Sequence, residues 1–328
     1  MSSRALPAPR VRRLRIPIIW WLLLATFLIG WLLVSQFGRG DFIAPSNINN
    51  IVERSTALGI VAIGQTFAIL VGSLDLSVAY LISVTAVMAS YIMQGDPSRV
   101  PLALLVVFAI GGLVGLTNGL LVTKARINPL IATLGVGLIL RGLLNASFQN
   151  FAGSVPASFQ YLAYGSIGPL PVPMLVFAVL VAIAAFTLKG TRFGAHIYAV
   201  GGDRATARLS GIRADRIVIG AHVVTSMCAV LTGLYLASRL RSGAPWIGPD
   251  GVYDLESIAA VVVGGTVLAG GRGGVLGTVA GVLIFATLDV IFNQLGIGSY
   301  TKQVLRGLII IGAVAVYAYR AREREVVG

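Results

Sequence analysis

Long apolar segments separated by short polar connections follow one another along almost the whole chain. A membrane-spanning helix needs about 20 predominantly apolar residues, and ten segments approach that length. They lie at 16–34, 56–72, 76–93, 101–122, 129–149, 171–188, 217–238, 256–270, 274–292 and 303–319. The pattern predicts an all-α polytopic membrane protein with about ten transmembrane helices. Glycines break the short helices expected near 256–292, so the eighth and ninth segments either cross fully or include a half-helix.

The composition excludes most other classes of protein. Of the 328 residues, 56% are hydrophobic and only 11% are charged, whereas about 25% of residues are charged in soluble domains. A soluble globular enzyme, a disordered chain and a disulfide-stapled domain are therefore excluded. The single cysteine, Cys228, lies inside an apolar run and is expected to fill space in the core.

The basic residues predict which side of the membrane each connection occupies. The net charge is +13, and with the N-terminus inside, cytoplasmic connections hold 17 Lys and Arg residues against 7 in outer connections. Cytoplasmic loops are enriched in these residues, so both termini are predicted to be cytoplasmic and the charge is not attributed to nucleic acid. The expected organisation is a cytoplasmic basic arm at 1–15, one transmembrane domain at 16–320 with a basic cytoplasmic loop at 189–216, and a cytoplasmic tail at 321–328.

Three ionisable side chains fall within or between the predicted spans. Asp75 follows the second segment, where its carboxylate could cap the third helix. Arg141 lies within the fifth segment, and Asp289 lies near the outer end of the ninth, where we expect it to be solvated. A charge at membrane depth is costly and faces the interior of the helix bundle or water. Asp75 and Arg141 are therefore candidates for a substrate pathway.

Uncharged polar residues in or beside the spans allow two interpretations. They could form hydrogen bonds between helices, or they could line a pathway for a polyol, exchanging hydrogen bonds with its hydroxyl groups. The candidate pathway residues, charged ones included, are Gln65, Thr66, Asp75, Asn118, Thr133 and Arg141.

Two stretches share one spacing of glycines. The glycines that recur every four residues are Gly111, Gly115 and Gly119 in the first stretch and Gly273, Gly277 and Gly281 in the second. On a helix this spacing forms one smooth stripe, which lets two membrane helices pack closely. The alternative is a sliding interface that permits motion.

The basic loop contains a predicted short helix. The pair Gly201-Gly202 indicates a turn, Asp203 can act as the N-cap, and Gly211 can end the helix. The segment is either a solvated connector or a docking helix for a cytosolic partner. The candidate docking residues are Gly201, Gly202, Asp203, Arg204, Ala207, Arg208 and Gly211.

Motifs for catalysis and cofactors are not found in the sequence. It contains no P-loop pattern for holding ATP. The two histidines, His196 and His222, form no zinc motif, and no paired nucleophile and base stands out. We therefore expect a protein that is not an enzyme and binds no metal or cofactor of its own.

Four stretches carry the most informative motifs. They are GQTFAILVGSLDLSV at 64–78, NGLLV through NPLIATLG to RG at 118–142, TRFG through YAVGGD to LSGI at 191–212, and DLESIAAVVVGGT through GGRG at 254–273. In order and spacing they resemble the permease subunit of ribose-type monosaccharide ABC importers, the ribose, xylose, arabinose and galactose permeases. The resemblance covers roughly residues 50–310 and leaves out the N-terminal arm.

The resemblance implies the other parts of an importer in a bacterial inner membrane. A second permease chain, identical or a sister, would complete the channel. A cytoplasmic ABC ATPase subunit would use ATP and Mg, and a periplasmic sugar-binding protein would deliver the solute. The loop from Gly201 to Gly211 matches the segment expected to contact the ATPase. Family members often have Asn in place of Asp203 and an acidic residue in place of Ala205 or Thr206, which changes the charge of that contact.

The expected function is the import of a monosaccharide or related polyol, driven by a separate ATPase. One alternative is an ABC permease for another solute, such as a branched-chain amino acid, a nucleoside or a signalling furanose. A secondary transporter is the other alternative. The scarcity of carboxylates within the spans counts against it, because proton relays use such groups.

Overall fold

The computed structural model describes residues 17–38 and 40–326, which are mostly helical. The elements are α1 (Ile18–Phe37), α2 (Pro45–Leu70), α3 (Val78–Met93), a 3-10 helix (Pro97–Arg99), α4 (Val100–Thr123), α5 (Pro129–Ser147), α6 (Ala157–Tyr164), β1 (Ser166–Ile167), β2 (Leu170–Pro171), α7 (Val172–Gly190), α8 (Arg192–Gly202), α9 (Arg204–Leu209), α10 (Ala214–Leu240), α11 (Ile247–Asp250), α12 (Tyr253–Val263), α13 (Val275–Gln294) and α14 (Ser299–Val326). The predicted arm at 1–15 lies outside the described residues.

Six of the described helical segments are long and apolar enough to span a membrane. They are α1, α4 with the preceding 3-10 turn, α5, α7, α10 and α13. The helix α3 is apolar but has only 16 residues, and α12 has 11. The prediction of a helical, multi-pass membrane protein is thus confirmed at this level.

Several helix ends differ from the limits that hydropathy predicts, and two of them have a clear cause. The helix α2 begins at Pro45 rather than near position 56, because proline suits a first helical turn and the polar residues after it have partners. Asn47, for example, accepts a hydrogen bond from Gln294 on α13 (2.6 Å). The helix α12 ends at Val263 rather than near 270. The chain turns just after Val263, because Gly265 takes a left-handed conformation (φ +90°).

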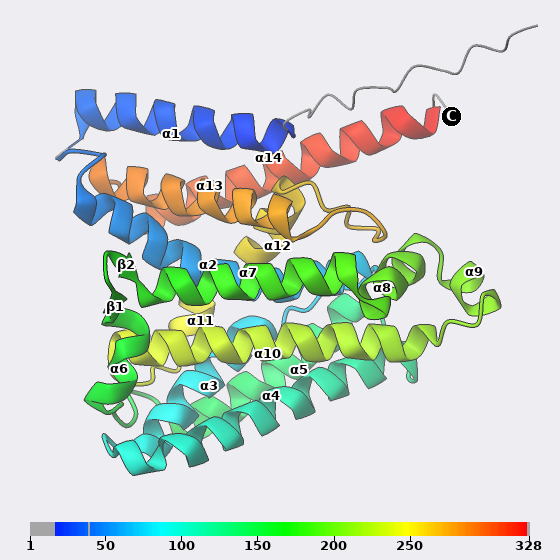
Figure 1. Cartoon of the computed structure of the whole chain (residues 1–328), viewed down its shortest axis with the longest axis horizontal. Coiled ribbons are helices and arrows are strands. Elements are labelled where there is room, and N and C mark those ends of the chain that lie inside the picture. The colour runs from blue at the N-terminus through cyan, green and yellow to red at the C-terminus, as the bar shows by residue number, and fades with distance from the viewer. Residues whose placement is uncertain (1–16, 39, 327–328) are drawn as a thin grey trace, which may run out of the picture.

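Several of the long helices lie roughly along the long axis of the molecule (Figure 1). At one end lie α6 and the antiparallel hairpin of β1 and β2. At the opposite end lie α8 and α9. We call these the α6 end and the α9 end. The helix α1 begins on the side of the α9 end, and α14 ends there (Figure 1).

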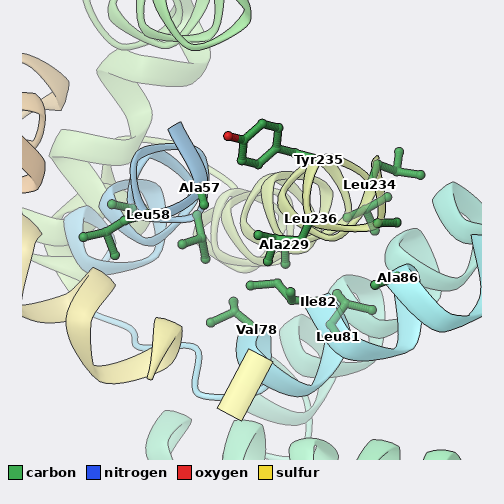
Figure 2. Packing of buried hydrophobic residues seen from close by; sticks show 14 of the residues in the cluster. Ala57, Leu58, Val78, Leu81, Ile82, Ala86, Ala229, Leu234, Tyr235 and Leu236 are labelled. Atoms are coloured by element: carbon green, nitrogen blue, oxygen red, sulfur yellow. The ribbon is translucent and has the colours of Figure 1, made fainter. Parts of the chain in front are cut away.

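The helix α10 forms the centre of the bundle and packs against α2, α3 and α4. Figure 2 shows Ala57 and Leu58 of α2, Ile82 of α3 and Ala229 of α10 among the buried side chains that fill this region. Lipid offers little hydrophobic drive for helices to associate, so close packing contributes much of the stability in such bundles.

The first glycine stripe lies on α4 and faces α10. A Cβ atom built at Gly115 would lie 2.7 Å from the Cα atom of Val223, and one at Gly119 would lie 2.7 Å from the Cα atom of Ile219. A Cβ at Gly111 would overlap the side chain of Val230. The three glycines therefore let two helix backbones approach closely.

The second glycine stretch does not form one helical stripe as expected. Gly277 and Gly281 lie on α13, where a Cβ would overlap the carbonyl oxygens of Gly264, the C-cap of α12, and of Ala260 within α12. Gly273 lies before α13, with a φ of +131°, and a Cβ there would meet Thr266. The prediction was wrong for Gly273 because its backbone conformation belongs to the turn between α12 and α13.

Candidate functional site

The break between α2 and α3 places a carboxylate in the interior of the bundle. Asp75 is buried, and its Oδ1 atom accepts hydrogen bonds from the amide (2.9 Å) and the hydroxyl (2.5 Å) of Ser77. The residue that precedes α3 is Ser77, so the expected N-cap role of Asp75 is wrong. The loop between α2 and α3 thus supplies its own donors, from Ser77, to Oδ1 of the Asp75 carboxylate. The other oxygen, Oδ2, is left for partners on neighbouring helices.

Two other helices supply partners for this carboxylate. Asn118 of α4 donates to Asp75 Oδ2 (3.2 Å) and to the Ser77 hydroxyl (2.9 Å). His222 of α10 places Nδ1 3.4 Å from Asp75 Oδ2. All these side chains are buried, and a buried charge needs such partners. Asp75 therefore ties the loop between α2 and α3 to α4 and α10.

Ser73 extends this chain of contacts. In the tautomer that satisfies both neighbours, His222 donates to Asp75 through Nδ1 and accepts from the Ser73 hydroxyl through Nε2 (2.9 Å). The order Ser–His–Asp is that of a hydrolase triad, a pairing that the sequence did not suggest. The serine is buried, however, so the arrangement holds the loop and does not present a nucleophile to a substrate.

Two more candidate pathway residues join the same loop. Gln65 exchanges two hydrogen bonds with the backbone of Asp75, at 3.3 and 3.1 Å, when its amide is oriented to satisfy both. The Thr133 hydroxyl on α5 accepts from the amide of Leu76 (3.0 Å). Thr66 lies apart and bonds the hydroxyl of Thr278 on α13 (2.8 Å). Four of the six candidates thus meet around one loop, and in this conformation they are buried.

Arg141 belongs to a different place. It lines a surface pocket of about 440 Å³ between α5, the first turns of α3 and the segment around α11. Tyr80 also lines this pocket, and a Cβ at Gly137 would lie 2.8 Å from the Tyr80 ring and 3.4 Å from the Cα atom of Ser77. The pocket is therefore a neighbour of the buried polar loop at the start of α3.

The predicted short helix is confirmed at the α9 end. The helix α9 covers Arg204–Leu209, and the Asp203 carboxylate caps it by accepting from the Thr206 amide (2.5 Å). Hydrogen bonds with Thr206 lower the pKa of that carboxyl below its usual value. Gly211 follows the helix with a φ of +81°, which glycine adopts without strain.

Gly201 and Gly202 do not form the expected turn but close the last turn of α8. A Cβ at Gly201 would overlap the carbonyl oxygen of Leu70, the last residue of α2. The amide of Gly271 donates to the same oxygen (2.9 Å). Gly201, but not Gly202, is thus required by a close approach of three backbones, at Leu70, Gly201 and Gly271, which we call the backbone junction.

Three cations converge on one carboxylate beside α9. Asp215, in the first turn of α10, accepts hydrogen bonds from Arg208 (2.7 Å), Arg204 (2.9 Å) and Lys124 (3.1 Å). This cluster fixes α9 against α10 and leaves an excess of positive charge at the surface. The neighbouring Leu209 is 89% exposed, so an apolar side chain stands free beside the basic cluster.

The position of Asp289 in the structure contradicts the expectation that this residue is solvated. It is buried and forms ion pairs with Arg54 of α2 and Arg306 of α14. Arg306 also pairs with Glu256 of α12 (3.0 Å). Both arginines lie on helices, where they neutralise carboxylates that would be costly inside the bundle without a partner.

Sequence reasoning missed three residues that organise these sites: His222, Asp215 and Leu209. A signal for His222 was present, because an ionisable residue in an apolar span requires a partner and Asp75 was available. Asp215 was hidden among the many charges of the basic loop, and the exposure of Leu209 depends on how α9 is oriented.

Comparisons with known proteins agree with this architecture. The family model described as the permease component of branched-chain amino acid transport systems matches residues 47–314. The chain is 36% identical over 284 residues to the ribose import permease protein RbsC of Haemophilus influenzae, covering 85% of this chain and 87% of the relative. It is 37% identical over 279 residues to the ribose import permease protein RbsC of Bacillus subtilis, covering 84% of this chain and 85% of the relative.

A galactose relative extends the likeness. The galactose/methyl galactoside import permease protein MglC of Escherichia coli is 31% identical over 300 residues, covering 85% of this chain and 88% of the relative. No solved structure gives a significant match. The family model spans the described helices from α2 to most of α14, and each of these relatives aligns with 84–85% of this chain. The chain therefore belongs to the permease family of ribose-type sugar ABC importers.

Proposed function

We propose that this chain is the membrane-spanning permease subunit of an ABC importer that carries a monosaccharide or related polyol into the bacterial cytoplasm. The observation that carries the proposal is its identity of 31–37% with ribose and galactose import permeases over most of both chains. The helix α9, with a basic cluster and an exposed leucine, supports it as a docking element for an energising partner.

The α9 end faces the cytoplasm in this proposal. Lys124, Arg204 and Arg208 gather there, which fits the enrichment of cations in cytoplasmic loops. The short helices α3 and α12, together with α2 and α14, complete ten membrane crossings with the six long apolar segments. Residues 16–320 form one domain, with both termini on the cytoplasmic side of the inner membrane.

Three partners complete the importer. A second permease chain forms the channel with this one, a periplasmic sugar-binding protein delivers the solute at the α6 end, and a cytoplasmic ATPase that uses ATP and Mg docks on α9. The exposed side chains of Leu209 and Arg208 supply the apolar and the charged part of that last contact.

The contacts around α9 suggest how docking reaches the transport pathway. The helix α9 follows α8, whose last turn touches the end of α2 at the backbone junction. Residues 71–77, which follow α2, form the loop that Asp75 ties to α4 and α10. Movement of α9 on closure of the ATPase would displace this loop and α3, and so switch the opening between the two sides.

Co-purification tests the docking claim. Leu209→Asp replaces an exposed apolar side chain that packs little against the rest of the chain, so the variant should fold. It should retain little ATPase after purification in mild detergent, because the proposed apolar contact with the ATPase is lost. Arg204→Glu with Arg208→Glu should also lower ATPase recovery, through charge reversal and through release of α9 from Asp215. The control is Arg99→Glu, an exposed basic residue near the α6 end. Normal ATPase recovery with both sets of variants would overturn the docking claim.

A second solute class remains a specific alternative. The matching family model is described by branched-chain amino acid transport, whereas the relatives named above import ribose and galactose. Proteoliposomes holding the complete importer distinguish the two, since uptake of radiolabelled leucine without uptake of ribose or galactose would replace the sugar proposal.

A further inference from the structure

The pocket beside Arg141 has the lining of a ligand site. Aromatic rings and polar side chains share its wall: Tyr80, Phe148 and Trp246 supply rings, and Arg141, Asn145 and Asp250 supply polar groups. Its volume of about 440 Å³ falls within the range of about 300–1,000 Å³ found for small-molecule pockets. Among the residues that the structure describes, the side chains of Arg141, Asn145 and Asp250 make no hydrogen bond or ion pair, so their polar atoms are free for a ligand.

The rings are held in place by neighbours outside the pocket. Trp246 packs edge-on against Phe151, with ring centres 5.2 Å apart, and Phe148 packs edge-on against Tyr91, at 5.3 Å. Aromatic pairs of this geometry are favourable beyond the area they bury. The aromatic part of the wall is therefore preformed rather than assembled by a ligand.

The segment that carries Trp246 and Asp250 is also fixed to α3. The amide of Gly248 in α11 donates to the Ser83 hydroxyl (3.0 Å), and a Cβ at Gly248 would overlap the carbonyl oxygen of Ala79. Ala79 directly precedes Tyr80 and lies four residues after Asp75. The pocket wall is thus attached to the start of α3, the helix that directly follows the buried loop around Asp75.

The charge of Arg141 disfavours lipid as its neighbour. Arg141 lies on α5, a candidate membrane span, and its side chain is exposed. A guanidinium at membrane depth faces water or protein rather than lipid. An aqueous channel between two permease chains would meet this requirement, with one such pocket contributed by each chain.

We propose that this pocket binds the ring of a neutral monosaccharide during its passage through the permease, an inference that rests on the proposed function. Flat aromatic faces accommodate the apolar face of a sugar ring, and planar polar groups can each bond two neighbouring hydroxyls. Arg141 and Asp250 carry opposite charges, so the pocket suits a solute without net charge. Three rings and the amide of Asn145 favour a polyol over a branched aliphatic amino acid.

Transport measurements on the complete importer test this inference. The permease is reconstituted with its ATPase and binding protein, and initial uptake of radiolabelled ribose and galactose is measured for Trp246→Ala and Asn145→Ala. Loss of a ring or hydrogen-bonding contact should lower uptake about tenfold, while the amount of ATPase bound stays normal. The matched controls are Trp21→Ala and Asn49→Ala, both on exposed positions outside the pocket, which should transport like the wild type.

The outcomes separate the inference from the function on which it rests. If the wild type imports sugar and the pocket variants match their controls, the pocket assignment is overturned and the proposed function stands. If the wild type imports radiolabelled leucine but neither sugar, the proposed function itself fails.

A fluorescence measurement does not depend on transport. With Trp20, Trp21 and Trp31 replaced by Phe, Trp246 is the one remaining tryptophan. Titration with the transported sugar should then change its emission in a saturable way, whereas leucine should not. An emission that is insensitive to both sugars would overturn the proposal even where the alanine variants fold poorly.

Discussion

At the scale of single residues, the buried Asp75 carboxylate depends on the donors around it. Ser77, Asn118 and His222 together replace the water that the carboxylate would have outside the membrane. Removal of one donor leaves a buried charge with fewer partners, which costs more than the bond itself contributes. The identity of each partner, rather than its size alone, therefore matters here.

Asn118 offers a direct test of this dependence. Asn118→Ala removes one donor and should lower the free energy of unfolding by about 1–3 kcal/mol. Asn118→Asp keeps the size but puts a second carboxylate beside Asp75, so it should be the more damaging change. The thermal midpoint in detergent should fall in that order, and Asn49→Asp, at an exposed position of α2, should leave it unchanged. Equal midpoints for the two Asn118 variants would contradict the electrostatic explanation.

The sequence made part of this site predictable. Charge and polarity within apolar segments singled out Asp75, Asn118, Gln65 and Thr133, and the structure brings all four together. The pairing of Asp75 with His222 joins positions 147 residues apart, and a hydropathy pattern contains no information about such distant contacts. Burial of Asp289 was missed for the same reason.

At the scale of helices, glycines set how closely α4 and α10 can pack. Gly115→Ala should lower the free energy of unfolding by about 1–3 kcal/mol, because the new Cβ would lie 2.7 Å from a Cα atom and 2.9 Å from the His222 carbonyl oxygen. The neighbouring Gly112→Ala is the matched control, since its Cβ would lie 3.6 Å from Met227 and make an ordinary contact. Similar thermal midpoints for both variants would show that the stripe does not limit the packing.

Helix existence was easier to predict than helix limits. Each predicted apolar segment contains a helix, because a backbone in lipid must satisfy its own hydrogen bonds. Observed helix limits differ from the predicted ones where polar side chains form hydrogen bonds, as at the start of α2. They also differ where a glycine conformation ends a helix, as after α12. Both effects depend on tertiary neighbours rather than on hydropathy.

At the scale of the whole molecule, the two ends predict how the chain sits in the membrane. With Cys228→Ala as background, a single cysteine is introduced by Ser210→Cys next to α9 or by Ser166→Cys in the hairpin, both at exposed positions. A membrane-impermeant maleimide added to intact spheroplasts should label only the hairpin cysteine, and permeabilisation should expose the other. Labelling of the α9 cysteine in intact spheroplasts would reverse the orientation and exclude docking of a cytoplasmic ATPase there.

The backbone junction has a consequence for how such transporters can diverge. In the proposed importer, partner recognition would use exposed side chains of α9. The contact of α8 with the end of α2 uses instead a main-chain carbonyl, a main-chain amide and a glycine with no side chain. Main-chain atoms are the same in every residue. If an ATPase docks on α9 as proposed, mutation of α9 side chains could therefore alter the choice of ATPase without altering the linkage that would transmit its motion. Partner specificity would then depend on side chains and force transmission on main-chain atoms, so the first could change in evolution while the second is conserved.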